Sequence, residues 1–201
     1  MAAKVVLSSL SFEIRPGEFV ALLGVSGAGK TTLLKTLIGE VSTFSGDITA
    51  TGRFGYAPQR APLFPWLTVF ENLRLALPNS VASDDGENRI RDLLKRAQLE
   101  SAGDLKPQAL SGGMRTRVSL LRAFLMSAPV ILMDEPFLGL DFVTRETLHE
   151  LTLSLARETG ATILFVTHDI DEALKLANRV LVLRNDGRGF SLDQTGADWK
   201  A

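Results

Sequence analysis

The stretch FVALLGVSGAGKTT occupies residues 19–32 and decides the fold class of this chain. Its first five residues are apolar and have the length of a buried strand, and Gly24–Thr31 matches the pattern G-x-x-x-x-G-K-[ST]. Residues 30–39 then show helical spacing of apolar side chains, with Gly39 suited to the C-terminal cap. This order of strand, turn and helix predicts a phosphate-binding loop, because glycines let backbone N–H groups close around phosphate oxygens at a helix N-terminus.

Two side chains of this loop carry specific expectations. We expect Lys30 to neutralise the β- and γ-phosphates of a nucleotide and Thr31 to place its hydroxyl on Mg²⁺. The alternative is a tight turn in which the glycines serve geometry alone. At average residue frequencies the pattern arises by chance in roughly one chain in a hundred of this length, so phosphate binding is favoured.

A second apolar stretch ends in two acidic residues. Val130–Met133 predicts a strand, and Asp134 and Glu135 follow it directly. Open α/β sheets bind their ligands at the carboxyl ends of the strands. We therefore expect Asp134 to hold Mg²⁺ and Glu135 to accept a proton from an attacking water. If this strand stood alone, a solvated pair of loop acids would be the better interpretation.

Three further sites are ambiguous when each is taken alone. Ser111–Gly113 precedes a helical pattern, so Ser111 is either a simple N-cap or part of an anion site at a helix start. His168 follows a strand predicted over residues 162–166, where it can donate to a γ-phosphate, although a lone histidine is more often structural. His149 lies within a charged helical segment and keeps the structural interpretation, and Gln59 is by itself a polar loop residue.

The composition is that of one ordinary globular domain. The chain has 201 residues, 45% of them hydrophobic and 22% charged, with a formal net charge of -1. This balance argues against nonspecific binding to nucleic acid. The absence of cysteine excludes disulfides and thiolate metal sites. The sequence contains no transmembrane-length apolar run and no signal-peptide core at its start, so we expect a cytoplasmic protein.

The remaining patterns predict an α/β fold. We expect strands at residues 10–14 and 19–23, and short antiparallel strands within residues 44–57. The middle third is mostly helical, with helices that begin at Thr68 and near Gly112 and another over residues 87–98. Strands at 130–133, 162–166 and 179–183 then alternate with helices at 142–158 and 170–177. This alternation predicts a parallel sheet with crossover helices, followed by a final hairpin or tail over 184–201.

Together the motifs resemble one family, the nucleotide-binding subunits of ATP-binding cassette (ABC) transporters. They follow that family's order over nearly the whole chain: phosphate loop Gly24–Thr32, Q-loop Gln59, signature Leu110–Gly113, Walker B strand ending at Asp134–Pro136, D-loop ending at Asp141, and switch histidine His168. The resemblance implies an α/β P-loop NTPase core with a mixed, mainly parallel sheet, an antiparallel β subdomain and a small helical subdomain. Residues 1–59 and 127–201 would form the catalytic core with the β subdomain, and residues 60–126 the helical subdomain.

The resemblance implies a role for each motif residue. Glu135 would be the general base, His168 would contact the γ-phosphate, and Gln59 would sense both Mg²⁺ and the coupling surface. The Mg²⁺ ligands would be Thr31, Gln59 and Asp134. The residues that bind ATP would be Gly24, Ser26, Gly27, Ala28, Gly29, Lys30, Thr31 and Thr32. In this family two subunits sandwich two ATP molecules head to tail, so Ser111, Gly112, Gly113 and Asp141 would act in trans on the partner's nucleotide.

Residues 62–73, 134–137 and 167–173 look most like bacterial importers of the group that moves nitrate, sulfonates, taurine or thiamine-like compounds. This resemblance implies a transport-coupled ATPase on the inner face of the membrane. Its partners would be a second cassette, forming a homodimer, the transmembrane permease subunits and, indirectly, a periplasmic or surface solute-binding protein, with no nucleic acid. Residues 60–77 would receive the permease's coupling helix, where Phe64, Trp66 and Phe70 would be docking contacts or packing residues.

Three positions depart from the family's pattern. No aromatic residue precedes Phe12 to stack on adenine, Met114 stands where glutamine is commonest, and Leu138 replaces the usual D-loop serine. From the length that follows residue 183, we expect no C-terminal regulatory domain. Two other functions are alternatives. One is a soluble ABC-type ATPase in an assembly such as iron–sulfur cluster assembly, and the other is a P-loop kinase, against which the signature and Glu135 count.

Overall fold

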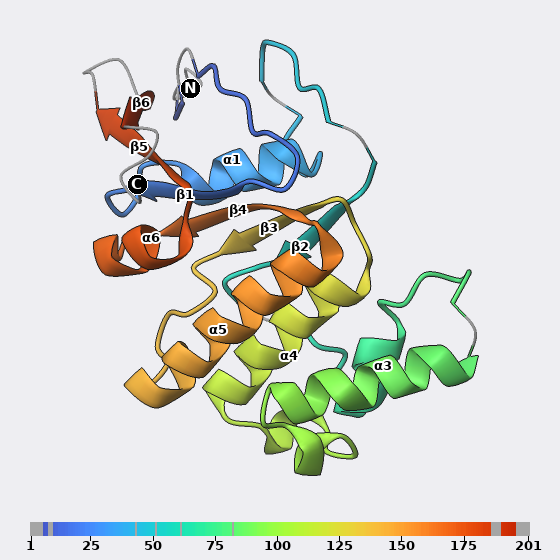
Figure 1. Cartoon of the computed structure of the whole chain (residues 1–201). Helices are drawn as coiled ribbons and strands as arrows, with labels where there is room; N and C mark the ends of the chain where they lie inside the picture. The colour runs from blue at the N-terminus through green and yellow to red at the C-terminus, as the bar shows by residue number, and fades with distance from the viewer. Residues whose placement is uncertain are drawn as a thin grey trace.

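The computed structural model describes residues 6, 7, 10–42, 44–50, 52–60, 62–81, 83–185 and 190–195. A mixed six-stranded sheet runs through its centre in the order β2-β3-β4-β1-β5-β6 (Figure 1). The strands are β1 (Phe19–Gly24), β2 (Phe54–Ala57), β3 (Val130–Asp134), β4 (Thr162–Thr167), β5 (Arg179–Asn185) and β6 (Phe190–Thr195). All neighbouring pairs are parallel except β5 and β6, which form a terminal antiparallel pair. The mainly parallel α/β sheet is thus confirmed.

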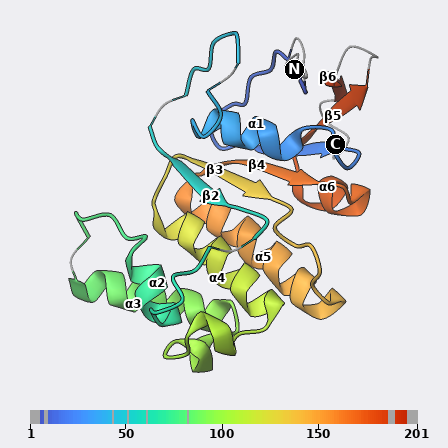
Figure 2. The same cartoon turned by 180° about the vertical axis from the view of Figure 1, so that it is seen from behind.

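Helices cover both faces of this sheet (Figures 1 and 2). Helix α1 (Lys30–Leu37) packs on one face, and α4 (Gly112–Leu125), α5 (Phe142–Thr159) and α6 (Ile170–Leu176) pack on the other. Helices α2 (Val69–Arg74) and α3 (Ser83–Arg96) lie beyond α4, with two short 3₁₀ turns at Glu100–Ala102 and Pro107–Ala109. Among the described residues, no helix is both long and apolar enough to cross a membrane.

The core has two parts because each central strand is buried on both faces. In β1, Phe19 and Ala21 join the apolar cluster under α4 and α5, while Val20 and Leu22 join the cluster under α1. Continuous apolar strands of this kind are typical of parallel sheets covered by helices on both sides. Gly55 in β2 lets α4 approach closely, because a Cβ there would lie 2.7 Å from the carbonyl oxygen of Ala123.

The helix ends follow the local sequence signals. Thr68 caps α2 in a capping box, in which its hydroxyl accepts from the Glu71 N–H and the Glu71 carboxylate accepts from the Thr68 N–H. Past the C-terminus of α1, Gly39 has a φ of 81°, and the N–H groups of Gly39 and Glu40 return to the carbonyls of Thr36 and Lys35. The predicted helix starts at Thr68 and near Gly112 are confirmed.

Two strand expectations are wrong within the described residues: the strand at 10–14 and the antiparallel pairing within 44–57. Residues 10–15 form no strand, although Leu10, Phe12 and Ile14 alternate inward onto the cluster under α1. Their period of two thus reflects the burial of alternate side chains, and the backbone of residues 10–15 is not part of the described sheet. Residues 44–50, 52 and 53 form no strand either, and Gly46 and Gly52 have φ values of 120° and 84° that interrupt extended pairing. Only β2 remains of that segment, and it pairs with β3 in parallel.

Candidate nucleotide-binding and catalytic site

Three neighbouring strands end at one edge of the sheet and bring the candidate site together. In the order β3-β4-β1, Asp134 pairs with Val166, and Thr167 pairs with Leu23. Because these strands are parallel, the residues that follow them emerge at the same edge. Residues far apart in the sequence therefore meet at this edge: Asp134 and Glu135, His168, and the loop Gly24–Lys30. The side chains of Lys30, Asp134, Glu135 and His168 are called the Lys30 cluster below.

The loop between β1 and α1 has the backbone of an anion-binding turn. Gly27 and Gly29 have φ values of 79° and 89°, which favour glycine, and the Ala28 N–H bonds the Val25 carbonyl. Helix α1 starts at Lys30 without a side-chain cap, so its first N–H groups have no capping oxygen. A Cβ at Gly24 would lie 3.1 Å from the Cβ of Leu183. The loop thus presents free backbone donors at a helix N-terminus, which favours an anionic ligand.

Lys30 is buried and faces this loop. Its Nζ donates to the carbonyls of Gly24 at 2.6 Å and Val25 at 3.2 Å, and lies 3.9 Å from Oε1 of Glu135. The carbonyl contacts keep a buried ammonium hydrogen-bonded. The ammonium group is therefore held between the phosphate loop and the acid after β3.

Asp134 is buried at the end of β3, and its Oδ1 has no hydrogen-bond partner among the described residues. Burial is the largest cause that raises its pKa, and the neighbouring Thr31 hydroxyl opposes this effect. A buried, unpaired carboxylate oxygen beside a hydroxyl is the donor set that a hard cation such as Mg²⁺ prefers. These two residues therefore fit a magnesium ion.

Glu135 has a strained backbone that aims its carboxylate at the same point. Its φ is 50°, an uncommon value for a residue with a side chain, and its N–H is fixed by the Val166 carbonyl at 3.0 Å. One carboxylate oxygen lies 2.7 Å from Nδ1 of His168 and the other 3.9 Å from Nζ of Lys30. The side chain of Glu135 is only 12% exposed, whereas that of His168 is 57% exposed. A carboxylate between two cationic or polar donors is suited to hold and deprotonate a water.

Gln59 lies two residues beyond the end of β2, and β2 is the strand that pairs with β3. Ala57 pairs with Met133, so Gln59 leaves the sheet at the edge where Asp134 and Glu135 emerge. It is exposed and forms no hydrogen bond within the described residues. The structure thus places Gln59 beside the cluster without joining it to Asp134 or Thr31.

The signature and the D-loop form a second group. Ser111 caps α4 by accepting from the Met114 N–H, and Asp141 caps α5 by accepting from the Thr144 N–H. A Cβ at Gly113 would lie 3.0 Å from a methyl of Leu140, so the two loops pack on each other. Within the described residues, no hydrogen bond or ion pair joins Ser111, Gly112, Gly113 or Asp141 to Lys30 or Glu135. Their helices lie on the face of the sheet opposite α1 (Figure 2).

Hydrogen bonds to Asp141 lower its pKa, first from the side chain and then from the backbone of Thr144, so it remains anionic at neutral pH. Behind the signature, the guanidinium of Arg115 donates to the Leu110 carbonyl at 2.6 Å and fixes the loop. Both helix starts are thus capped by a side chain, and Ser111 and Asp141 are exposed to solvent.

Three buried polar residues, Thr167, Glu172 and Asn72, carry no motif in the sequence, and His149 is buried as well. Thr167 and Glu172 form a hydrogen bond directly behind His168, and His149 packs edge-on against Phe137 with ring centroids 4.4 Å apart. Asn72 bonds the carbonyls of Phe64, Leu67 and Thr68 and orders the turn before α2. The available signal was a polar residue within an apolar helical stripe, as at His149 and Asn72.

Two departures from the expected pattern have structural positions. Phe12 packs against the core cluster under α1 and does not form an exposed stacking platform. Leu138 in the D-loop is 47% exposed, although it is apolar. Residues 1–5, which precede Phe12, lie outside the described part of the chain.

Comparisons with known proteins agree with this arrangement. Residues 7–138 match the family described as ABC transporter. The aliphatic sulfonates import ATP-binding protein SsuB 1 of Frankia alni is 44% identical over 190 residues, which cover 94% of this chain and 69% of that protein. The spermidine/putrescine import ATP-binding protein PotA of Oleidesulfovibrio alaskensis is 39% identical, and the match spans 95% of this chain but only 53% of that protein.

A solved dimer of an ATP-binding cassette in a post-hydrolysis state, bound to ADP and Pi, has the same fold. It matches with a TM-score of 0.80 and 27% identity over 98% of this chain and 95% of that chain. The sulfonate importer belongs to the group expected from the motifs, and these relatives favour the transporter interpretation over an assembly ATPase. The chain therefore belongs to the ABC transporter family, in which it is a cassette that binds and hydrolyses ATP.

Proposed function

We propose that this chain is the ATPase subunit that drives a membrane permease for solute import, on the inner face of the cell membrane. The names of its relatives support import, since both are import ATP-binding proteins. This chain spans 69% of the length of one relative and 53% of the other. The observation that carries the catalytic part is the position of the Glu135 carboxylate between His168 and Lys30. ATP binding would close a dimer and hydrolysis would open it, as in gated enzymes.

In this proposal Glu135 is the general base. It accepts a proton from water while the water oxygen attacks the γ-phosphorus, and the bond from that phosphorus to the bridging oxygen of ADP breaks, giving ADP and phosphate. His168 contacts the γ-phosphate, and its Nδ1 atom holds the Glu135 carboxylate. The strained backbone of Glu135 supports this role, because such strain is typical of functional sites.

Binding of the nucleotide falls to the phosphate loop. We assign the phosphate contacts to Gly24, Ser26, Gly27, Ala28, Gly29, Lys30, Thr31 and Thr32, with Lys30 exchanging its loop carbonyls for phosphate oxygens. Asp134, Thr31 and Gln59 would hold Mg²⁺, which neutralises charge on the β- and γ-phosphates when bound. Asp134 with its unpaired oxygen is the strongest candidate of the three.

The second group would act on the partner's ATP. Ser111, Gly112, Gly113 and Asp141 are exposed or partly exposed at two helix starts, where N–H groups favour an anion. A homodimer with two-fold symmetry would place each group over the Lys30 cluster of the other chain. This division explains why one chain carries a phosphate loop and a separate anion site.

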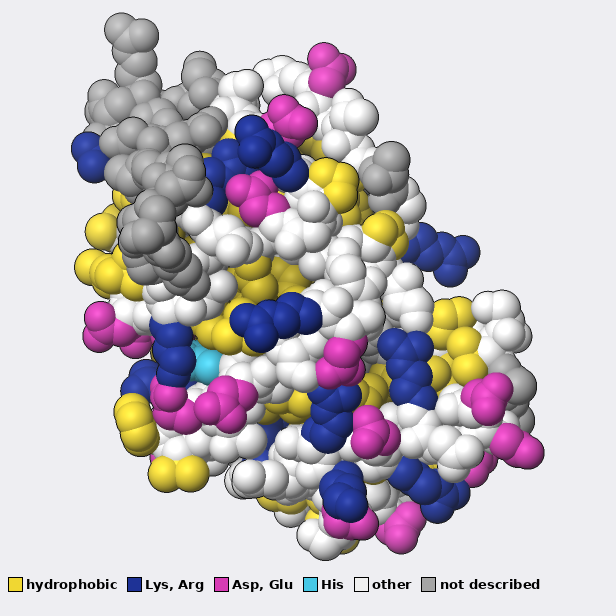
Figure 3. Space-filling model, viewed as in Figure 1, with side chains coloured by type: hydrophobic (Ala, Val, Ile, Leu, Met, Phe, Trp, Pro, Cys, Tyr) yellow, Lys and Arg dark blue, Asp and Glu magenta, His cyan; other side chains and the backbone are white. Residues whose placement is uncertain are grey.

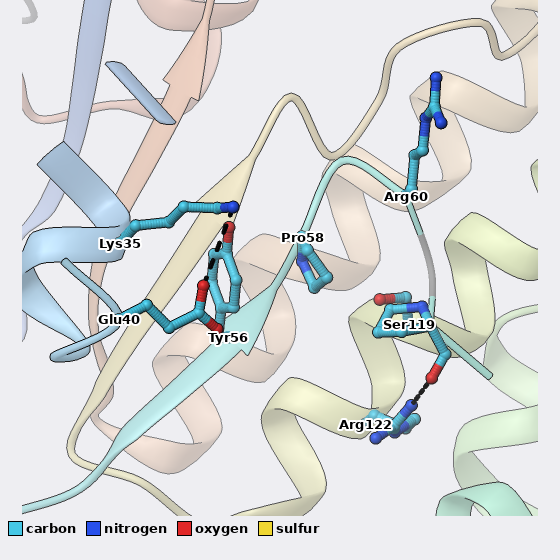
Figure 4. Close-up of a pocket in the computed structure, with 8 residues that line it drawn as sticks. Lys35, Glu40, Tyr56, Pro58, Arg60, Ser119 and Arg122 are labelled. Carbon is cyan, nitrogen blue, oxygen red and sulfur yellow. Dashed lines mark hydrogen bonds and ion pairs between the residues drawn. The ribbon is translucent and has the colours of Figure 1, made fainter. Parts of the chain in front are cut away.

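Docking of the permease would use the surface around Gln59 and the helical subdomain, residues 60–126. A cavity of about 370 Å³ lies there, lined by Lys35, Glu40, Tyr56, Pro58, Arg60, Pro62, Ser119 and Arg122. In Figure 4, Lys35 and Glu40 point toward each other beside Tyr56, and Arg60 extends away from the other labelled side chains. Trp66 is 66% exposed next to this region, whereas Phe70 packs against the core. A solute-binding protein would meet the permease, not this chain.

The test is ATP hydrolysis by the purified chain, compared between wild type and Glu135→Gln. We expect turnover to fall by about 10²- to 10⁴-fold because the base is lost, while ATP binding persists and light scattering detects a dimer trapped by ATP. Glu150→Gln is the matched control, since Glu150 is an exposed glutamate on α5 away from the cluster. Normal turnover in Glu135→Gln would remove Glu135 from the base role.

A further inference from the structure

A buried hydroxyl lies directly behind His168. Thr167 is fully buried at the end of β4, and its Oγ1 donates to Oε2 of Glu172 at 2.8 Å. The same oxygen accepts the N–H of Asp169 at 3.0 Å. One hydroxyl therefore ties the residues on both sides of His168 to each other and to α6.

Glu172 is an unusual residue to bury at this place. It is 7% exposed on the first turn of α6, where burial raises its pKa and the Thr167 hydroxyl opposes that rise. The cap of α6 does not require it, because Oδ1 of Asp169 already accepts the N–H groups of Asp171 and Glu172. Burying a carboxyl costs free energy unless it is hydrogen-bonded, and the Glu172 carboxyl accepts a hydrogen bond from the Thr167 hydroxyl.

Helix α5 braces α6 from the other side. The guanidinium of Arg145 lies 3.6 Å from Asp169, and Glu146 pairs with Lys175. Between these contacts, Nε2 of His149 lies 3.9 Å from Oε1 of Glu172. Figure 3 shows acidic and basic side chains gathered where α5 and α6 meet. The segment 167–172 is thus fixed by a buried contact and by exposed ion pairs around it.

The side chain of His168, in contrast, is mostly exposed, and within the described part of the chain its one polar contact is to Glu135. An exposed side chain held by one contact keeps much of its rotamer freedom, so its aim depends on how rigidly its backbone is held. Resting on the proposed role of His168 at the γ-phosphate, we propose that Thr167 and Glu172 are positioning residues that hold His168 in reach of Glu135 and the phosphate.

The first experiment compares two buried threonines. Thr167→Val keeps the β-branched shape but removes the hydroxyl, and Thr152→Val does the same on α5, where the Thr152 hydroxyl bonds the Leu148 carbonyl of its own helix. We expect Thr167→Val to lower kcat between about tenfold and a hundredfold with little change in KM, since misplaced groups cost rate. Thr152→Val should leave kcat within about twofold at a comparable Tm. Equal kcat values in the two variants would overturn the proposal.

The second experiment asks whether Thr167 acts through His168. In a His168→Ala background, Thr167→Val should have no further effect on the residual rate, because the positioned group is gone. An undiminished effect there would show a general packing role and overturn the proposal. A wild-type rate in His168→Ala alone would remove the role of His168, and the inference with it, while ATP hydrolysis itself would stand.

A pair of variants at the other end of the contact completes the test. Glu172→Gln retains an oxygen that can accept from Thr167, whereas Glu172→Leu does not. We expect kcat near wild type for Glu172→Gln and a loss like that of Thr167→Val for Glu172→Leu. Equal losses in both would overturn positioning through the hydrogen bond.

Discussion

Two groups of motif residues differ in burial and in the elements that supply them. The first group is Lys30, Asp134, Glu135 and His168, and the second is Ser111, Gly112, Gly113 and Asp141. The first group is largely buried, converges from three neighbouring strands and includes a strained backbone at Glu135. The second group includes the caps of two helices and is exposed or partly exposed, and the start of α4 packs at Gly113 against Leu140 of the D-loop. The difference teaches that the residues joined by contacts within this chain are mostly buried, whereas the residues that we propose act on a second chain's nucleotide are exposed or partly exposed at helix starts.

The variant with the largest expected effect is Lys30→Ala, which tests whether the first group binds ATP. Lys30 supplies the buried positive charge of the phosphate loop, so we expect the Kd for ATP to rise about a hundredfold or more, since each charge-assisted hydrogen bond contributes about 1.5–3 kcal/mol. Titration with a fluorescent ATP analogue measures this. Lys95→Ala, an exposed lysine on α3, should bind like wild type. An unchanged Kd in Lys30→Ala would contradict the placement of phosphate in this loop.

Ser111→Arg changes the second group and should act differently. A bulky cation at the α4 start would block the partner's nucleotide, so we expect turnover to fall between about tenfold and a hundredfold while the chain's own Kd for ATP changes little. Thr68→Ala controls for loss of a helix cap, which costs about 1 kcal/mol, because Thr68 caps α2 far from the site.

Mixing the two variants distinguishes a trans role from a local one. A dimer of one Lys30→Ala chain and one Ser111→Arg chain contains one doubly altered site and one intact site. We expect the mixture to hydrolyse ATP faster than either variant alone. A mixture no faster than its components would argue that the signature serves its own chain.

The smallest effect concerns His149, which is buried on α5 and packs against Phe137. Burial lowers its pKa from 6.5 to about 4, and Glu146, Lys175, Arg145 and Glu172 surround it. The unfolded chain therefore binds this proton more readily, so the free energy of unfolding is highest above pH 6.5 and falls as the pH drops through 4.

This loss should amount to on the order of 1–3 kcal/mol between pH 6.5 and 4 in the wild type. His149→Leu should lack it, so that urea unfolding of the variant depends less on pH across this window. Parallel pH profiles for the two proteins would show that His149 does not titrate as its burial requires.

Much of the fold and of the Lys30 cluster could be predicted because the signals are local. The strands at 19–24 and 130–134 are apolar and end in motif residues, and Ser111 and Thr68 stand at helix starts as cap chemistry requires. The strand predicted at 10–14 failed, because alternation reports which side chains are buried and does not report whether a neighbouring strand supplies hydrogen bonds.

Other features of the site depend on pairs that lie far apart in the chain. The packing of Gly113 on Leu140 and the ring contact of His149 with Phe137 follow from how α4 and α5 cross the sheet. The Thr167 hydroxyl and the Glu172 carboxylate are only five residues apart in the sequence. Both residues are buried, and His149 of α5 lies beside Glu172. The residue types at these positions do not by themselves indicate which distant residue each one contacts.

The sequence by itself determined the phosphate loop, the acids after β3, the alternation of strands and helices, and the membership of the family, because each rests on residue types at fixed spacing. Only the tertiary structure decided that Glu135 adopts a positive φ between Lys30 and His168, that Asp134 keeps an unpaired oxygen, and that the signature stays outside this cluster. The reason is physical: spacing specifies local backbone geometry, whereas burial and the meeting of strand ends arise only when the whole sheet is assembled.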